Sequence, residues 1–127
     1  MRLDISREVL DAIRGEAAAS PDVEVCGLLL GEGLRVEQVV ACRNVATEPA
    51  TQFEIDPQAL IAAHRTARGG GPAVIGHYHS HPTGNAGPSS RDTANAMGDS
   101  AIWIIVGGDD VSAWRSNSPG RLEPIKL

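Results

Sequence analysis

Apolar side chains recur along this sequence at two spacings, one typical of helices and one typical of strands. Near the N-terminus and again in the middle of the chain they repeat every three to four residues, which predicts helices over residues 6–19 and 57–68. Ser6 and Asp56 stand where these helices begin, as N-cap residues commonly do. We therefore expect two amphipathic helices, each with one apolar face to bury.

Short apolar runs bounded by turn residues predict the strands. They cover residues 24–31, 34–42, 52–55, 73–80, 101–106, 111–115 and 122–127. A further short helix is predicted after Ser89, with Asp92 as its capping-box partner. Because strands alternate with helices, the pattern predicts a single α/β domain over residues 1–127, in which helices pack on a mixed β-sheet.

Composition and charge narrow the class of protein. The chain has 127 residues, 42% of them hydrophobic, which suffices for one core. Its net charge of −5 and the absence of a Lys/Arg run argue against nucleic-acid binding. No apolar run approaches the roughly 18 residues that span a bilayer, and the charged N-terminus is unlike a signal peptide. Cys26 and Cys42 lie in apolar surroundings as reduced thiols would, so we expect a cytoplasmic protein without membrane contact.

Three of the four histidines, His77, His79 and His81, fall within five residues. Residues two apart on a strand share a face, so neighbouring pairs can bind one ion. The Cα atoms of His77 and His81 would be roughly 13 Å apart on a straight strand, too far for all three to do so. The pair is therefore either His77 with His79 or His79 with His81. Pro82 ends the strand beside the second pair and favours it, because sites form where strands pass into loops.

A third ligand is available in Asp92, which lies in the first turn of the next predicted helix. Two histidines, one carboxylate and a water form the open tetrahedral arrangement of catalytic zinc. Each part has a simpler explanation when taken alone: polar strand residues for the histidines, and a plain capping box for Ser89 and Asp92. Only their combination indicates a metal site.

At this point the chain resembles a known family. The run His79-Ser80-His81-Pro82, followed after six residues by Ser89 and after two more by Asp92, matches the JAMM motif of the JAB1/MPN/Mov34 metalloproteases. The family's first strand bears a glutamate, and Glu24 matches it, so the motif residues extend from 24 to 92. The resemblance implies the MPN fold, a three-layer domain similar to that of cytidine deaminases, of the small prokaryotic type.

The resemblance also implies a role for each motif residue. His79, His81 and Asp92 would hold Zn²⁺, with a water in the fourth position. Glu24 would accept the proton of that water and deliver it to the leaving amine, and Ser89 would help to stabilise the oxyanion. Eukaryotic relatives commonly have Trp where this chain has His77, which we interpret as a strand residue beside the site.

The substrates implied by the resemblance are ubiquitin-like or sulfur-carrier proteins that end in Gly-Gly. The enzyme would act as an isopeptidase and hydrolyse the bond after the second glycine. The segment 44–55 is the expected edge along which such a tail adds as a strand. Two alternatives are a catalytically silent MPN scaffold and a zinc hydrolase of another peptide. The sequence leaves open the identity of the carrier, the leaving group and whether the chain forms a homodimer.

Overall fold

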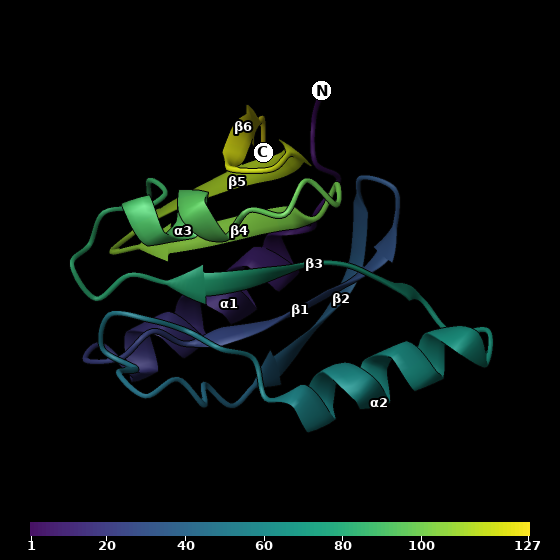
Figure 1. Ribbon diagram of the computed structural model, residues 1–127, viewed down its shortest axis with the longest axis horizontal. Coiled ribbons are helices and arrows are strands. Elements are labelled where there is room, and N and C mark those ends of the chain that lie inside the picture. The colour runs from purple at the N-terminus through teal and green to yellow at the C-terminus, as the bar shows by residue number, and fades with distance from the viewer.

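Six strands form one mixed β-sheet in the order β2-β1-β3-β4-β5-β6 (Figure 1). The computed structural model describes residues 1–127. Its strands are β1 (Cys26–Glu32), β2 (Arg35–Cys42), β3 (Ala73–Ser80), β4 (Ile102–Gly107), β5 (Asp110–Ser118) and β6 (Arg121–Ile125). All neighbours pair antiparallel except β3 and β4, which are parallel. The mixed sheet expected from the sequence is confirmed.

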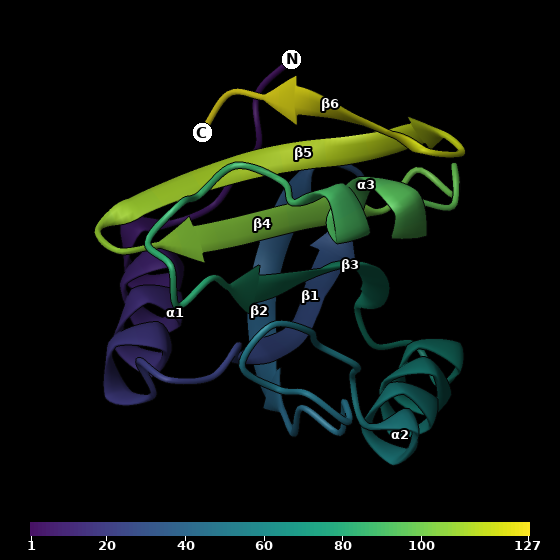
Figure 2. The ribbon, with the colours of Figure 1, turned by 60° about the vertical axis from the view of Figure 1, so that its left-hand side comes forward.

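Helices cover both faces of this sheet and complete a three-layer domain (Figure 2). They are α1 (Arg7–Ala19), α2 (Pro57–Arg68) and α3 (Ser90–Asn95). The predicted caps are present, since the side chain of Ser6 accepts from the backbone N–H of Val9 and that of Asp56 accepts from Gln58. None of the three helices has the length and apolar character needed to cross a membrane.

The main hydrophobic core lies between α1 and the sheet. Ile13 of α1 is buried there together with Leu29 of β1, Tyr78 of β3 and Ile104 of β4. The hydroxyl of Tyr78 also donates a hydrogen bond to Glu16 of α1. Because side chains alternate along a strand, the neighbours of Tyr78 in β3 point to the opposite face of the sheet. The core thereby fixes β3 with its histidines turned away from α1.

Two sequence predictions need correction. Residues 52–55 form no strand and make only an isolated bridge between Asn44 and Ile55, because backbone groups of this segment bond to the Asn44 side chain instead. The first strand begins at Cys26 rather than at Glu24, because the N–H of Glu24 donates to the carbonyl of Pro49 in a loop. The other element ends agree with the prediction to within about three residues.

Candidate active site

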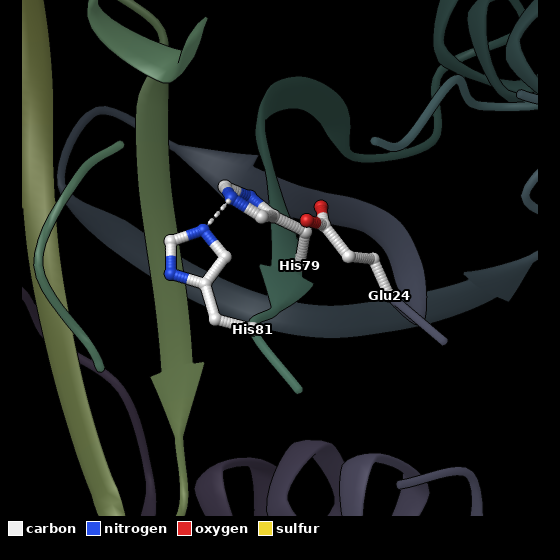
Figure 3. A group of neighbouring side chains, drawn as sticks. All are labelled: Glu24, His79 and His81. Carbon is white, nitrogen blue, oxygen red and sulfur yellow. Dashed lines mark hydrogen bonds between the residues drawn. The ribbon is translucent and has the colours of Figure 1, made fainter. Parts of the chain in front are cut away.

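Three side chains converge where β3 ends and α3 begins. His79 is the second-last residue of β3, His81 lies just beyond that strand, and Asp92 is in the first turn of α3. The Nε2 atoms of the two histidines are 3.1 Å apart, and Asp92 Oδ2 lies 3.2 Å from Nε2 of His79 and 3.1 Å from that of His81. Figure 3 shows the two rings meeting through these nitrogens with Glu24 alongside. All four residues are buried.

The triangle formed by these three atoms has the size of a zinc site. Zinc with tetrahedral ligands at about 2.0–2.1 Å holds its ligand atoms roughly 3.3 Å apart. The three distances, 3.1, 3.1 and 3.2 Å, are close to that value. Two imidazole nitrogens and a carboxylate oxygen are also the donor set that zinc binds in catalytic sites. The residues therefore fit the ion.

The charge state of the triangle suits a cation. Burial alone would raise the pKa of Asp92, but hydrogen bonds with His79 and His81 outweigh it and hold that pKa well below its usual value. Burial lowers the pKa of His79, against the opposing effect of its bond to Asp92. At neutral pH Asp92 is thus an ionised carboxylate and His79 a neutral imidazole, the forms in which both groups bind metals, while the hydrogen bond to Asp92 raises the pKa of His81.

A hydrogen-bonded chain sets the orientation of the His81 ring. Its Nδ1 lies 2.7 Å from the carbonyl oxygen of Asn85, and because a carbonyl only accepts, Nδ1 donates there and the ring turns its Nε2 toward His79 and Asp92. The loop that bears this carbonyl is held in turn. Ser112 Oγ donates to the carbonyl of Ala86 at 2.5 Å, and Trp114 Nε1 donates to Ser112 Oγ at 2.7 Å.

Stacking orients the His79 ring instead. Its Nδ1 has no hydrogen-bond partner, but the ring lies on that of Phe53 with centroids 4.2 Å apart and planes at 17°. His77 lies next to these rings, 4.4 Å from the centroid of Trp103, and its Nδ1 is likewise unpartnered. Burial, with a smaller effect of His79, lowers the pKa of His77 to about 4. His77 is therefore an uncharged neighbour of the triangle and lies outside it.

Glu24 approaches the triangle from the segment before β1. Its carboxylate and one ring nitrogen each of His79 and His81 lie within 4.8 Å of one another, and the residue is only 6% exposed. Burial raises its pKa to about 7, while His81 lowers it, Asp92 raises it and Arg91 lowers it by smaller amounts. A carboxyl group with this pKa takes up and releases protons readily at neutral pH.

Ser89 connects the site to α3 through the predicted capping box. Its Oγ accepts from the N–H of Asp92 at 3.0 Å, and its own N–H donates to Asp92 Oδ2 at 2.9 Å. The second bond fixes the very oxygen that faces the two histidines. The cap thus orients the Asp92 carboxylate, while the Ser89 hydroxyl hydrogen remains free because Oγ acts there as an acceptor.

Comparisons with known proteins agree with this geometry. The family described as prokaryotic homologs of the JAB domain matches residues 6–117. The chain belongs to this family. A desampylase of Haloferax volcanii is 32% identical over 114 residues, which are 85% of this chain and 82% of that protein. A probable TtuB-protein conjugate cleaving protease of Thermus thermophilus is 34% identical, over 88% of this chain and 74% of the relative.

Solved structures support the same fold for this JAB-family protein. A protein from Desulfitobacterium hafniense superposes with a TM-score of 0.79 at 24% identity and covers 98% of this chain and 90% of its own. A JAB1/MPN domain protein from Archaeoglobus fulgidus gives 0.62 at 20% identity, over 98% and 96%. The expected family and fold are confirmed, as is the enzyme class, a JAMM-type isopeptidase.

Two small hollows of the JAB-family site meet at Glu24 and Thr51. One, of about 180 Å³, is walled by Phe53 and Trp103 and reaches Asp92. The other, of about 190 Å³, runs past His81 and Ser89. The sequence analysis identified neither Phe53 nor Trp103 as part of the site. The one hint was that Phe53, the only phenylalanine in the chain, lies between the second strand and the second helix.

Proposed function

We propose that this JAB-family protein is a zinc-dependent JAMM isopeptidase that hydrolyses the bond after the C-terminal Gly-Gly of a ubiquitin-like or sulfur-carrier protein. The observation that carries the proposal is the triangle of His79 Nε2, His81 Nε2 and Asp92 Oδ2 with the carboxylate of Glu24 beside it. The relatives named for desampylase and conjugate-cleaving activity support the class of substrate.

His79, His81 and Asp92 would hold the zinc ion. Glu24 also lies near enough to the histidines to be a candidate ligand. Asp92 Oδ2, however, is within 3.2 Å of Nε2 of both histidines, and the low pKa of Asp92 keeps it ionised. The raised pKa of Glu24, about 7, suits a proton carrier better than a ligand. When bound, zinc supplies a Lewis acid and lowers the pKa of a coordinated water.

The protein's own groups then divide the remaining chemistry. Glu24 accepts the proton of the attacking water and delivers it to the leaving nitrogen, because its pKa near 7 favours both transfers. Ser89 donates its free hydroxyl hydrogen to the carbonyl oxygen as that oxygen gains negative charge. These roles are compatible with the capping box, which uses only the lone pair and the backbone N–H of Ser89.

The small hollows favour a tail without side chains. The two hollows, of about 180 and 190 Å³ and both lined by Glu24, suit an extended Gly-Gly strand better than bulky residues. The segment 44–55, which borders both hollows through Thr51, is the proposed edge for strand addition. The JAMM domain would then comprise residues 1–127, and the protein would act in the cytoplasm.

Bound zinc and cleavage test the proposal separately. Wild-type protein is assayed for metal content and incubated with a sulfur-carrier fusion that bears extra residues after its Gly-Gly. We expect stoichiometric zinc and a product ending at the second glycine. Glu24→Gln should retain zinc and lose about 1,000-fold in kcat, whereas Glu8→Gln, an exposed helix substitution, should leave kcat unchanged.

The outcomes distinguish the parts of the proposal. Stoichiometric zinc without cleavage of any Gly-Gly fusion contradicts the substrate class and leaves the metal site standing. Such a result would favour a silent scaffold or a hydrolase of another peptide. Absence of zinc from the wild type, with no change in Asp92→Ala, contradicts the metal site as well.

A further inference from the structure

Asn44, which follows β2, uses the whole hydrogen-bonding capacity of its side chain. Its Nδ2 donates to the carbonyl oxygens of Glu24 at 2.8 Å and Gln52 at 2.9 Å. Its Oδ1 accepts from the N–H groups of Ala46 and Glu54, both at 3.0 Å. A carboxamide has two donor hydrogens and an oxygen with two lone pairs, so all four positions are occupied. One side chain thus joins both ends of the loop 45–54 to the segment that carries Glu24.

The main chain of Glu24 is held by this loop rather than by the sheet. Its N–H donates to the carbonyl of Pro49 at 2.8 Å, and its carbonyl accepts from Asn44 Nδ2. Glu24 precedes β1 and has no partner in the strand ladders. The pairing of β1 with β3 brings Glu24 near the histidines, and the loop then helps to set where its carboxylate stands relative to them.

The same loop supports a proposed metal ligand. It carries Phe53, whose ring stacks on His79, and His79 Nδ1 has no hydrogen bond that could fix its ring instead. Figures 1 and 2 both show the chain between β2 and α2 passing beside the carboxyl end of β3. Thr51, on the same loop, borders both hollows of the site. Displacement of the loop would move the main chain of Glu24 and remove the stacking partner of the His79 ring together.

We propose that Asn44 is a positioning residue for the hydrolysis: its carboxamide fixes loop 45–54 and thereby sets the positions of Glu24 and of the His79 ring. Only an amide of this length meets the requirement. Aspartate has the same shape, but its ionised carboxylate only accepts, so it would repel the carbonyls of Glu24 and Gln52. Serine offers a single hydroxyl for the four bonds. This inference rests on the proposed function for its catalytic part.

Asn44→Asp, measured against Asn117→Asp, tests the proposal. Asn117 is an exposed asparagine of β5 whose amide donates one hydrogen bond, to Glu123, so the control makes the same change away from the site. For Asn44→Asp we expect the amides of Ala46 and Glu54 to exchange with solvent about tenfold faster. We also expect kcat to fall about 100-fold with KM changed less than about threefold and zinc retained. The visible absorption of Co²⁺ bound in place of zinc should change as the His79 ring turns.

Asn44→Ser provides a second variant should the aspartate prevent folding, and it should change every readout in the same direction. Unaltered amide exchange, or a kcat equal to that of Asn117→Asp, would overturn the proposal. A wild type that cleaves no Gly-Gly fusion contradicts the proposed function instead. In that case amide exchange and the Co²⁺ spectrum test the positioning role of Asn44 without the hydrolysis. If both are unaltered in Asn44→Asp, the positioning role is wrong.

Discussion

Burial controls the reactivity of single side chains in this protein, and Cys26 is the plainest case. The residue is fully buried, and its Sγ lies 3.9 and 3.7 Å from the carbonyl oxygens of Cys42 and Arg43. Burial, with smaller contributions from Cys42, Glu16 and Glu24, raises the pKa of Cys26 to about 12. The thiolate is the reactive form, so this thiol is inert at neutral pH although it lies two residues from Glu24.

Alkylation of the folded protein should therefore spare Cys26. A raised pKa lowers the thiolate fraction tenfold per unit, so at pH 8 Cys26 holds about 1,000-fold less thiolate than a thiol of pKa 9. Timed iodoacetamide treatment followed by peptide mass mapping should show label on the half-buried Cys42 first. Both thiols should react in urea. Equal labelling rates in the folded state would contradict the assigned burial.

At the scale of single residues, the sequence predicted His79, His81 and Asp92, which converge in the site. It did not predict the residues that hold the site in place. The spacing of His79, His81 and Asp92 indicated the triangle, because strand geometry and a capping box are local rules. The roles of Asn44 and Phe53 depend on the path of loop 45–54, which no local rule predicts. Both reach the site through contacts with residues more than eight positions away.

Between β3 and β4 there is no room for a side chain at Gly76. Gly76 pairs with Ile102, and a Cβ added at Gly76 would lie 2.0 Å from the carbonyl oxygen of Ile102. No side chain fits at that distance without separating the two strands. Since His79 and Ser80 continue the same ladder, the close approach also aligns the end of β3 that leads to the site.

Gly76→Ala should consequently destabilise the fold by about 3 kcal/mol, because backbone atoms must shift to admit the methyl group. Gly15→Ala is the matched control, since Gly15 is an exposed residue of α1 with no atom within 4 Å of its added Cβ. That change should stabilise the protein by about 1 kcal/mol through helix propensity. Urea unfolding of both variants measures the difference, and a Gly76→Ala protein as stable as wild type would contradict the close approach.

The chain from Trp114 through Ser112 to the Ala86 carbonyl connects β5 to the loop that orients His81. Ser112→Ala removes its middle member and should weaken zinc binding about tenfold, as loss of a partner behind a ligand usually does. Ser118→Ala, a change at the far end of β5, should leave the affinity unaltered. Competition with a chelating dye measures both, and equal affinities would show that the loop holds its position without Ser112.

Element ends were predictable where capping residues and turns mark them. Ser6, Asp56 and Ser89 each cap the helix expected after them. The wrong strand over residues 52–55 has a physical reason: its alternating polar and apolar residues fitted the strand pattern, but its backbone groups bond to the side chain of Asn44.

For the whole molecule, zinc would tie separate elements together, because its proposed ligands come from β3, the segment after it and α3. At a free zinc concentration about 100 times Kd, binding should add about 2.7 kcal/mol to the free energy of unfolding. Chelation should then lower the melting temperature by about 10 °C. In Asp92→Asn, which keeps the shape of the side chain, calorimetry should find little effect of chelator. A wild type that is equally insensitive would contradict a tightly bound ion.

The layered architecture was predictable from the sequence, whereas the strand order was not. A period of two shows which side chains share a face, but it leaves open which strand lies next to which. Nothing local indicates that β1 enters between β2 and β3, a pairing that joins Cys26 with His79 across more than fifty residues. That pairing brings Glu24 to the triangle.

This distant pairing has a consequence for the protein while it is being made. The proposed ligands all lie within residues 79–92, whereas the proton carrier is at residue 24 and reaches them only through the β1–β3 pairing. On the proposed function, the segment that carries the ligands could not by itself hydrolyse a peptide bond, because the carboxylate of Glu24 joins it only with the β1–β3 pairing. Hydrolysis would then begin only once the sheet has closed, and a half-folded copy would not cut neighbouring chains.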